Sequence, residues 1–551
     1  MFPASIRPKP NDPGSSISRR RGSHALSGWR GPCKKGHTGQ LLFALQMGVL
    51  LAAIASWLVA SAYRRRMLVL MRGGPAPQDA VALAVNLPVT TPATGAHRSG
   101  LSAAHHRASV RAVLTVAGVS LLIGLTQSWL SFLFVYDDAR GFTLRRVLVL
   151  GAVSAWPMVM GWGLLRRWSW GRVLLGIGVY MLVMAVVVML NSTEQQTWAG
   201  VMGWLGSVVV IPMVVALLIS ASGRIRAVAP YLLPIFLLLS AASTGALSLL
   251  AAGMQDPPVW IVQLVGVLGA WPTIVLLALL PWLLLAWPVW RVGMWLAQAY
   301  RDKRFSDLGY LLAAYWFVIL VASALPAVEG AGWLGFTQLL PWLWLPLLAK
   351  LLPRWLAPEG APPTLLVLRV FQHDAAVETM FDRVIERWRL TGNTVLIAGT
   401  DLISRTLDPD DLFTFLNGRL GERFIASPAQ VPQRLAEFDL KPDPDGRYRV
   451  NECYCFDGTW QAALAALVER ADVVLMDLRG FQARNAGCRH ELSVLSTAAH
   501  VQRVVLLRDG HTDRAAAESD IAAAPPGRFV WVDAGLLNQG KATQILGQLL
   551  N

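Results

Sequence analysis

The chain has 551 residues, of which 54% are hydrophobic and only 15% are charged, and its formal net charge is +15. This composition excludes a wholly soluble protein, and four cysteines are too few for the disulfide framework of a small secreted protein. Residues 1–362 hold 29 Lys and Arg against 10 Asp and Glu (+19), whereas the remainder holds 20 against 24 (−4), so the soluble part lacks the positive charge that nucleic-acid binding requires.

Residues 1–40 are rich in Arg, Ser, Pro and Gly, and we expect them to be disordered. A membrane domain at 41–350 follows, because its apolar runs of about 18 to 25 residues have the length that a helix needs to cross a bilayer. The runs predict nine spans, at 41–62, 112–135, 147–165, 172–190, 198–220, 230–252, 259–288, 308–327 and 331–349.

The loops between these spans predict the orientation. Every second loop is basic, with Arg166, Arg167, Arg172, Arg224, Arg226, Arg291, Arg301, Lys303 and Arg304. By the positive-inside rule these loops and everything after residue 350 are cytoplasmic, which predicts a multi-pass protein of the inner (plasma) membrane. Two basic segments fall on the opposite side, namely residues 1–40 and the loop with Arg145 and Arg146. Two hypotheses would explain the disagreement with the rule. Translation from Met47 would remove the first segment, or the first span does not insert into the membrane.

The predicted spans carry almost no ionisable residues in their centres, which argues against an ion-coupled transporter. An anchor or a sensory bundle is the favoured interpretation. A cavity for a lipid or another apolar ligand, floored by Gln127, Gln263 or Gln338, stays open as an alternative, although polar residues in spans more often hold helices together.

A Pro-rich linker at 351–363 leads into a predicted domain at 364–551. Its strands are expected at 365–370, 394–397, 448–455, 473–477, 503–507 and 529–532, and its helices at 375–390, 410–420, 459–471, 485–498 and 541–550. Strands that alternate with helices of this length predict a mostly parallel sheet with helices on both faces. The predicted fold class is therefore a multi-span α-helical membrane domain followed by a doubly wound α/β domain.

The stretch from Ala471 to Leu492 holds the candidate site. A buried strand ends at Asp477, a loop opens at Arg479, and Asn485 can cap a helix whose inward stripe is Cys488, Leu492, Leu495 and Ala499. Ligands of open α/β sheets bind outside the carboxyl ends of the strands. We therefore expect Asp477, Arg479, Asn485, His490 and Glu491 to lie where a small molecule is held.

Four other motifs favour ordinary structure. The segment Gly535–Ala542 nearly matches a phosphate-binding loop, but Ala542 replaces the hydroxyl residue that Mg²⁺ needs, and Gly330–Gly335 has no strand before it. Cys453 and Cys455 project from one face of a strand without further ligands at zinc spacing, so we expect small buried residues. Asp408, Asp410 and Asp411 are typical of the start of a helix, and no metal or cofactor is predicted.

The segment Asn485–Leu492 (NAGCRHEL) resembles a motif of the Toll/interleukin receptor (TIR) domain, Ser-x-Trp-Cys-x-x-Glu-Leu, in which the glutamate is catalytic in the members that cleave NAD. Cys488, Glu491 and Leu492 match the motif, whereas Asn485 replaces Ser and Gly487 replaces Trp. The segment is also similar, more weakly, to the nucleoside deoxyribosyltransferase group, whose glutamate attacks the sugar. Residues 402–471 form a longer segment than TIR domains usually have at this place.

The resemblance implies a TIR-like, flavodoxin-like domain that works when copies of it associate, with NAD as the substrate. Glu491 would stabilise positive charge at the anomeric carbon, and Asp477, Arg479, Asn485 and His490 would bind the substrate. The expected function is membrane-tethered signalling or defence by a protein that binds a nucleotide such as NAD and, if it is an enzyme, cleaves the N-glycosidic bond. The alternatives are a non-catalytic interaction module on a membrane scaffold and a transporter with a regulatory domain.

Overall fold

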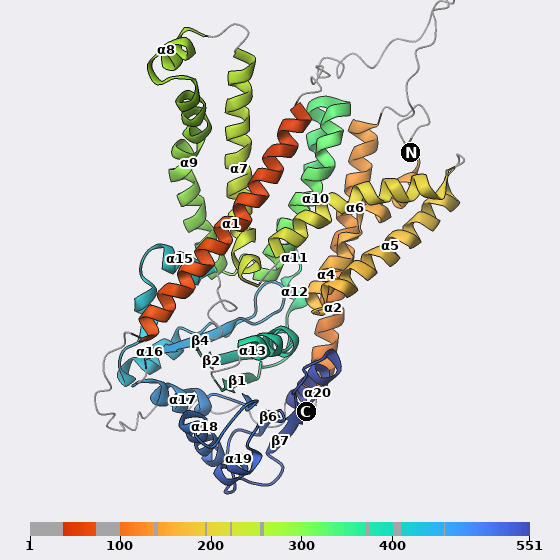
Figure 1. The fold of residues 1–551 in the computed structure, drawn as a ribbon. Coiled ribbons are helices and arrows are strands. Elements are labelled where there is room, and N and C mark those ends of the chain that lie inside the picture. The colour runs from red at the N-terminus through yellow and green to blue at the C-terminus, as the bar shows by residue number, and fades with distance from the viewer. Residues whose placement is uncertain are drawn as a thin grey trace, which may run out of the picture.

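A computed structural model of the chain describes nine segments. They are residues 37–72, 100–136, 142–192, 196–220, 223–253, 258–370, 374–399, 409–456 and 458–551. The predicted disordered tail at 1–40 therefore lies outside the described residues, except for its last four. A bundle of long apolar helices stands on a C-terminal α/β domain (Figure 1).

In the part of the chain that the structure describes, the bundle contains seven long helices and three shorter ones of 9 to 11 residues. They are α1 (His37–Arg72), α2 (Leu101–Leu130), α3 (Leu144–Ser154), α4 (Pro157–Leu165), α5 (Trp170–Asn191), α6 (Trp198–Ser220), α7 (Gly223–Gly253), α8 (Val259–Leu268), α9 (Ala270–Arg301) and α10 (Asp307–Ala331). Among the described residues, seven helices are long and apolar enough to cross a membrane. The number is eight if α3 and α4, which meet at 41°, form one bent span. These helices fit a multi-pass membrane protein.

The predicted span at 259–288 has the wrong bounds, because the chain breaks at Gly269 and the helix long enough to cross a membrane is α9, Ala270–Arg301. This glycine has a φ of +87°, a conformation that side chains rarely adopt, and it separates α8 from α9. Pro281 and Pro288 lie inside α9. With ten residues, α8 is too short to cross a bilayer, and α9 instead continues to Arg301.

The predicted span at 331–349 does not form one α-helix either. The chain instead forms the 3₁₀ helix η4 (Gly332–Leu343), which is followed by α11 (Trp344–Leu351) and α12 (Pro353–Leu356). A Cβ at Gly335 would lie 2.3 Å from the backbone nitrogen of Val328 in α10, so η4 packs directly against the backbone of α10. This close contact depends on the tertiary structure and has no signature in the hydropathy of the segment.

The α/β domain contains one seven-stranded sheet in which all the paired strands are parallel, in the order β3-β4-β2-β1-β5-β6-β7. The strands are β1 (Thr364–Arg369), β2 (Asn393–Ile397), β3 (Phe424–Ile425), β4 (Val450–Cys455), β5 (Val473–Asp477), β6 (Arg503–Arg508) and β7 (Phe529–Asp533). All six predicted strands are confirmed, and the two-residue β3 is an addition at the edge.

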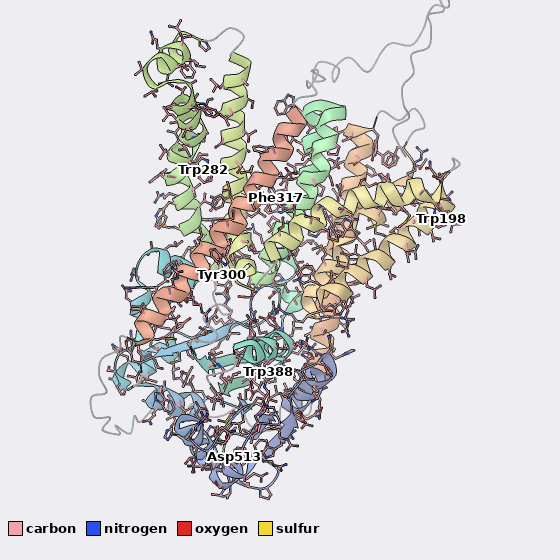
Figure 2. All side chains as sticks on the ribbon, viewed as in Figure 1. Trp198, Trp282, Tyr300, Phe317, Trp388 and Asp513 are labelled. Carbon is pink, nitrogen blue, oxygen red and sulfur yellow. The ribbon has the colours of Figure 1, made fainter. Side chains whose placement is uncertain are left out.

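Alternation along the central strands buries both faces of the sheet. Leu366, Met476 and Leu506 point into one core and Leu365, Leu475 and Leu507 into the other. The first core lies under α16 (Val431–Ala436), α17 (Trp460–Glu469), α18 (Ala486–Thr497) and α19 (Arg514–Asp520). The second lies under α13 (Asp374–Met380), the π-helical turn η5 (Phe381–Ile385), α14 (Glu386–Trp388) and α20 (Gln539–Leu550). Figure 2 marks Trp388, a fully buried member of the second core.

The loops predicted to be basic and cytoplasmic meet the α/β domain. Arg167, between α4 and α5, forms ion pairs with Asp382 and Glu386, and Lys303, after α9, pairs with Asp439 at 2.7 Å. These loops and the α/β domain therefore share one end of the bundle. Arg145 instead donates a hydrogen bond to Asn191 at the last residue of α5, so it stays an exception to the charge rule.

Candidate functional site

The strand order reverses at β1, because the chain first builds the sheet outward through β2 and β4 and then returns to place β5 on the other side of β1. In open parallel sheets a crevice forms at such a reversal, outside the carboxyl ends of the strands. Arg369 and Asp477 are the last residues of β1 and β5, and they lie in register. Residues 371–373 and 400–408 lie outside the described residues.

Asp477 and Arg479 lie at this edge as predicted, but they bind each other. Arg479 donates from Nε to Asp477 Oδ1 at 2.8 Å and from Nη2 to Oδ2 at 2.5 Å. Nη1 of Arg479 donates to the backbone oxygen of Ala534 after β7, at 3.4 Å. Both side chains are 5% exposed. The pair therefore connects the loop after β5 to the neighbouring part of the sheet.

The loop after β5 is also held by Asp509, which the sequence analysis did not single out. Its Oδ1 accepts hydrogen bonds from the backbone nitrogen of Gly480, the backbone nitrogen of His511 and the hydroxyl of Thr512. Burial works against the charge of Asp509, but these hydrogen bonds outweigh it and hold its pKa below the ordinary value. The only signal in the sequence is its place after a predicted strand.

Asn485 stands at the N-cap position of α18, but its side chain does not cap the helix. Its Oδ1 accepts a hydrogen bond from the backbone nitrogen of Gln482, at 2.7 Å, in the preceding turn. The predicted inward stripe is confirmed for Cys488, Leu492 and Leu495, whereas Ala499 is exposed and lies beyond the last helical residue, Thr497. The predicted capping bond and the fourth stripe position are therefore wrong.

His490 and Glu491 point in opposite directions. His490 is exposed, and its ring makes an edge contact with the ring of Trp460 on the adjacent helix α17, with 5.5 Å between the centroids. Glu491 is 4% exposed, and it belongs to the buried face of α18 together with Cys488. Of these two residues, therefore, only Glu491 is buried in the domain.

In the described part of the chain, one oxygen of the Glu491 carboxyl group lacks the hydrogen-bond partner that a buried carboxylate needs. Among the described residues, no hydrogen bond reaches its buried Oε2. Burial raises the pKa of Glu491 to about 8, and the positive charge of Arg369 opposes this effect only in part. At neutral pH the group is therefore mostly protonated, and a ligand that brings a positive charge would favour loss of the proton.

Burial also raises the pKa of the neighbouring Cys488 thiol, to about 12, and Glu491 adds to this effect. Cys488 is consequently a neutral thiol at physiological pH and is not activated as a nucleophile. Arg369 is the charged neighbour of Glu491 that the sequence analysis missed. One indication of it is present in the sequence, because Arg369 is the charged residue at the end of the apolar run LLVLR.

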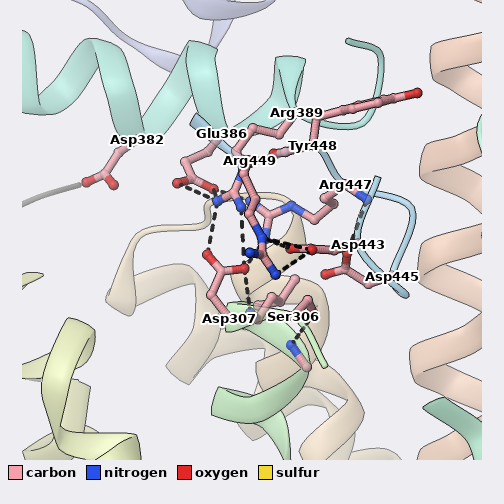
Figure 3. A network of polar contacts seen from close by, with 12 residues as sticks. Ser306, Asp307, Asp382, Glu386, Arg389, Asp443, Asp445, Arg447, Tyr448 and Arg449 are labelled. Atoms are coloured by element: carbon pink, nitrogen blue, oxygen red, sulfur yellow. Dashed lines mark hydrogen bonds and ion pairs between the residues drawn. The ribbon is translucent and has the colours of Figure 1, made fainter. Parts of the chain in front are cut away.

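A second polar cluster, the junction cluster, lies between the helices and the α/β domain. It consists of Arg167, Asp307, Glu386, Arg389 and Arg447 (Figure 3). Glu386 accepts contacts from three arginines, and Arg389 also pairs with Asp307 at 3.0 Å. Burial works against the charge of Arg389, but Asp307 and Glu386 more than offset it and hold its pKa well above the ordinary value. Its acids and bases are paired, which is typical of a structural contact.

The described residues contain no group of three or more His, Cys, Asp or Glu side chains arranged to bind a metal ion. Cys453 and Cys455 lie with their sulfur atoms 3.8 Å apart on one face of β4, as predicted. Asp408 lies outside the described residues, and Asp411 is paired with Arg423 at 2.8 Å. Lys541 pairs with Asp533 at 3.2 Å, so the lysine of the near-match to a phosphate loop is engaged within the protein.

The comparisons with known proteins add no family to this geometry. No protein-family model matches the chain, and no curated protein or solved structure matches it.

Proposed function

We propose that the chain is a membrane-tethered signalling or defence protein. Its cytoplasmic α/β domain binds a nucleotide such as NAD at the carboxyl ends of β1 and β5, here called the β1–β5 edge, and cleaves the N-glycosidic bond of the nucleotide. The proposal rests on the carboxyl group of Glu491. The group is buried, its Oε2 has no hydrogen bond among the described residues, and its charged neighbour is Arg369, the last residue of β1, where the strand order reverses. Buried groups that lack partners cost stability, so they are concentrated where function requires them.

The order of the strands supports a doubly wound, TIR-like interpretation. Strands β2-β1-β5-β6-β7 follow the 2-1-3-4-5 order of flavodoxin-like folds, in which the ligand binds at the reversal. Strands β4 and β3 extend this order beyond β2. The chain that supplies them falls within residues 402–471, the stretch that is longer than in TIR domains. This extension lies beyond β2, so it does not change the carboxyl ends of β1 and β5.

The chemistry of a buried, neutral glutamic acid fits a cationic substrate. The nicotinamide ring of NAD is positively charged, so its approach would lower the pKa of Glu491 and release a proton to solvent. The resulting carboxylate then stabilises positive charge at the ribose anomeric carbon as the bond to nicotinamide breaks and its electron pair leaves with the nicotinamide nitrogen. Water adds to the sugar carbon and returns a proton to solvent. Activity should therefore rise as the pH increases toward about 8.

The test uses the purified full chain in detergent micelles, incubated with NAD at high concentration while released nicotinamide is measured. Glu491→Gln keeps the size of the side chain and removes the carboxylate. Glu469→Gln, at an exposed carboxylate in the last turn of α17, is the matched control. We expect turnover by the wild type and the control, and at least a hundredfold loss in Glu491→Gln.

The outcomes separate the candidate functions. If NAD raises the melting temperature of the wild type without being cleaved, the binding proposal survives and the catalytic step is wrong. If NAD neither stabilises the chain nor turns over, the nucleotide proposal fails and a non-catalytic interaction module on a membrane scaffold takes its place. The junction cluster specifically favours this second candidate, because it attaches the α/β domain to the helices through paired charges.

A further inference from the structure

A large cavity lies between the helices at the end of the bundle that carries the α/β domain. Its volume is 1320 Å³, above the range of about 300–1,000 Å³ that is usual for sites of small ligands. Residues of α2, α7, α9, α10 and α11 line the cavity, and the α/β domain contributes the loop Pro442–Arg447.

The walls of the cavity are apolar over most of their length. Leu233, Phe236, Val289, Leu296, Leu312 and Phe317 are among the side chains that line them. Protein interiors are packed closely, with few voids larger than a water molecule. A cavity of this size with an apolar lining is therefore expected to hold an apolar molecule, since water needs polar partners. It is not the polar, continuous passage that a transporter would need.

One end of the cavity is polar, and its exposed charges are positive. Arg304 follows α9 and has a side chain that is 63% exposed, and Lys350 lies exposed in the last turn of α11. The nearest partner of Arg304 is Asp302 at 3.7 Å, an exposed pair of little strength. Both cations line the cavity close to the α/β domain, where a phosphate group would find them.

The acidic groups at the same end lie beside arginines of the α/β domain. Asp443 has a fully buried side chain that pairs with Arg449 at 2.9 Å, and Lys303 lies 3.8 Å from it. Asp445 accepts a hydrogen bond from the backbone nitrogen of Arg447 at 3.1 Å, but its buried Oδ2 has no hydrogen-bond partner among the described residues. The charges of Arg449 and Arg447 offset these two carboxylates, whereas Arg304 and Lys350 are exposed at the cavity.

We propose that this cavity is a binding site for one anionic phospholipid, whose acyl chains lie between α7, α9 and α10 and whose phosphate group contacts Arg304 and Lys350. The lipid would touch the loop Pro442–Arg447, so the α/β domain forms part of the site. The proposal is independent of the nucleotide proposal, because it involves neither Glu491 nor the β1–β5 edge.

The experiment measures retained lipid by native mass spectrometry of the purified full chain in detergent. Phosphatidylglycerol and phosphatidylcholine with identical acyl chains are offered in parallel, and soluble glycerol phosphate is a third arm. We expect one phosphatidylglycerol molecule to be retained at least tenfold more than phosphatidylcholine, and no retention of glycerol phosphate. Retention of glycerol phosphate alone would overturn the lipid assignment in favour of a free anion.

Two pairs of variants test the position of the lipid. Val289→Trp fills the cavity from α9, whereas Leu283→Trp adds the same bulk at a position on α9 that is 69% exposed and does not line the cavity. Retention should fall at least tenfold in the first and stay unchanged in the second. Arg304→Gln combined with Lys350→Gln should abolish the preference for phosphatidylglycerol, and Arg291→Gln, an exposed cation of α9 outside the cavity, should keep it.

Each variant is first compared with the wild type by melting temperature and by gel filtration, and a variant that fails to fold is replaced by Val289→Phe or by the single charge substitutions. Equal retention of the two phospholipids by the wild type would overturn the proposal. Equal losses in Val289→Trp and Leu283→Trp would also overturn it, because the lipid would then coat the outer surface of α9.

Discussion

Glu386 and Glu491 lie in the same α/β domain, but they differ in the number of charged partners around the carboxyl group. Glu386, at the junction with the helices, is contacted by Arg167, Arg389 and Arg447. Glu491, behind the β1–β5 edge, has an Oε2 atom without a hydrogen bond among the described residues, and only the charge of Arg369 opposes the effect of burial on its pKa.

The comparison separates a carboxylate that holds the structure together from a carboxyl group that costs stability. A buried charge with several partners resists removal, because each partner would be left unpaired. A buried acid without partners instead keeps its proton, and the fold loses stability when the pH forces ionisation. The partners of a group, more than its burial, thus indicate which of the two residues is available to a ligand.

The largest effect is expected at the junction. Glu386→Gln removes the carboxylate shared by Arg167, Arg389 and Arg447. Glu386 itself is 20% exposed, but the side chains of Arg389 and Arg447 are only 6% and 5% exposed. Leaving a buried charge without its partner costs about 3–5 kcal/mol, which is an upper bound here because Asp307 stays beside both arginines. The melting temperature of the full chain in detergent should fall by up to roughly 10 °C. Glu359→Gln removes an exposed carboxylate that also accepts from two arginines, Arg107 and Arg111, and should leave the melting temperature nearly unchanged. An equal fall in both variants would break the comparison.

The second effect is a pH dependence that Glu491 introduces. Its folded pKa of about 8 lies above the ordinary value of 4.5, so the folded state holds a proton that the unfolded chain has released between these pH values. Stability from this group is complete below pH 4.5 and is lost as the pH rises through 8. Between pH 6 and pH 8 the loss is on the order of 3 kcal/mol, since one pKa unit corresponds to about 1.4 kcal/mol.

Glu491→Gln keeps an uncharged side chain and should remove most of this slope, which melting temperatures recorded from pH 5 to pH 9 would show. Asp443 also has a raised pKa, about 6, because burial outweighs the pull of Arg449. Its contribution ends near pH 6, so the difference between wild type and Glu491→Gln from pH 6 to pH 8 isolates Glu491. The exposed control Glu469→Gln should follow the wild type. Parallel profiles of wild type and Glu491→Gln would show that the carboxyl group is not buried as described.

The fold was predictable where local patterns decide it. Strand-like segments of four to eight residues between polar loops identified six strands, and β3 escaped because two residues make no pattern. Helix α19 escaped as well, because Ala517 is its only buried side chain and so no apolar stripe marks it. The broken span at Gly269 and the 3₁₀ helix η4 depend on backbone conformation and on contact with α10, which hydropathy does not contain.

The candidate site was predictable only in part, for a similar reason. The inward position of Glu491 follows from its spacing to Cys488 and Leu495 on one helix. The ion pair of Asp477 with Arg479 joins two residues that the sequence offered separately as ligand contacts. Arg369 and the junction cluster join residues that are far apart in the chain, such as Glu386 and Arg447, and no pattern in a single segment reveals such pairs.

The smallest effect is expected next to Glu491, at His490. Its ring lies on the outer side of α18 against Trp460, so His490→Ala removes one exposed edge contact and should change the free energy of unfolding by less than about 1 kcal/mol. The decisive measurement is the rise in melting temperature that a nucleotide produces, recorded for His490→Ala and for Glu491→Gln. A loss of this rise in His490→Ala that equals the loss in Glu491→Gln would place the ligand on the outer face of α18. The carboxyl group at the β1–β5 edge would then be a structural residue like Glu386, and the contrast between the two would no longer identify the site.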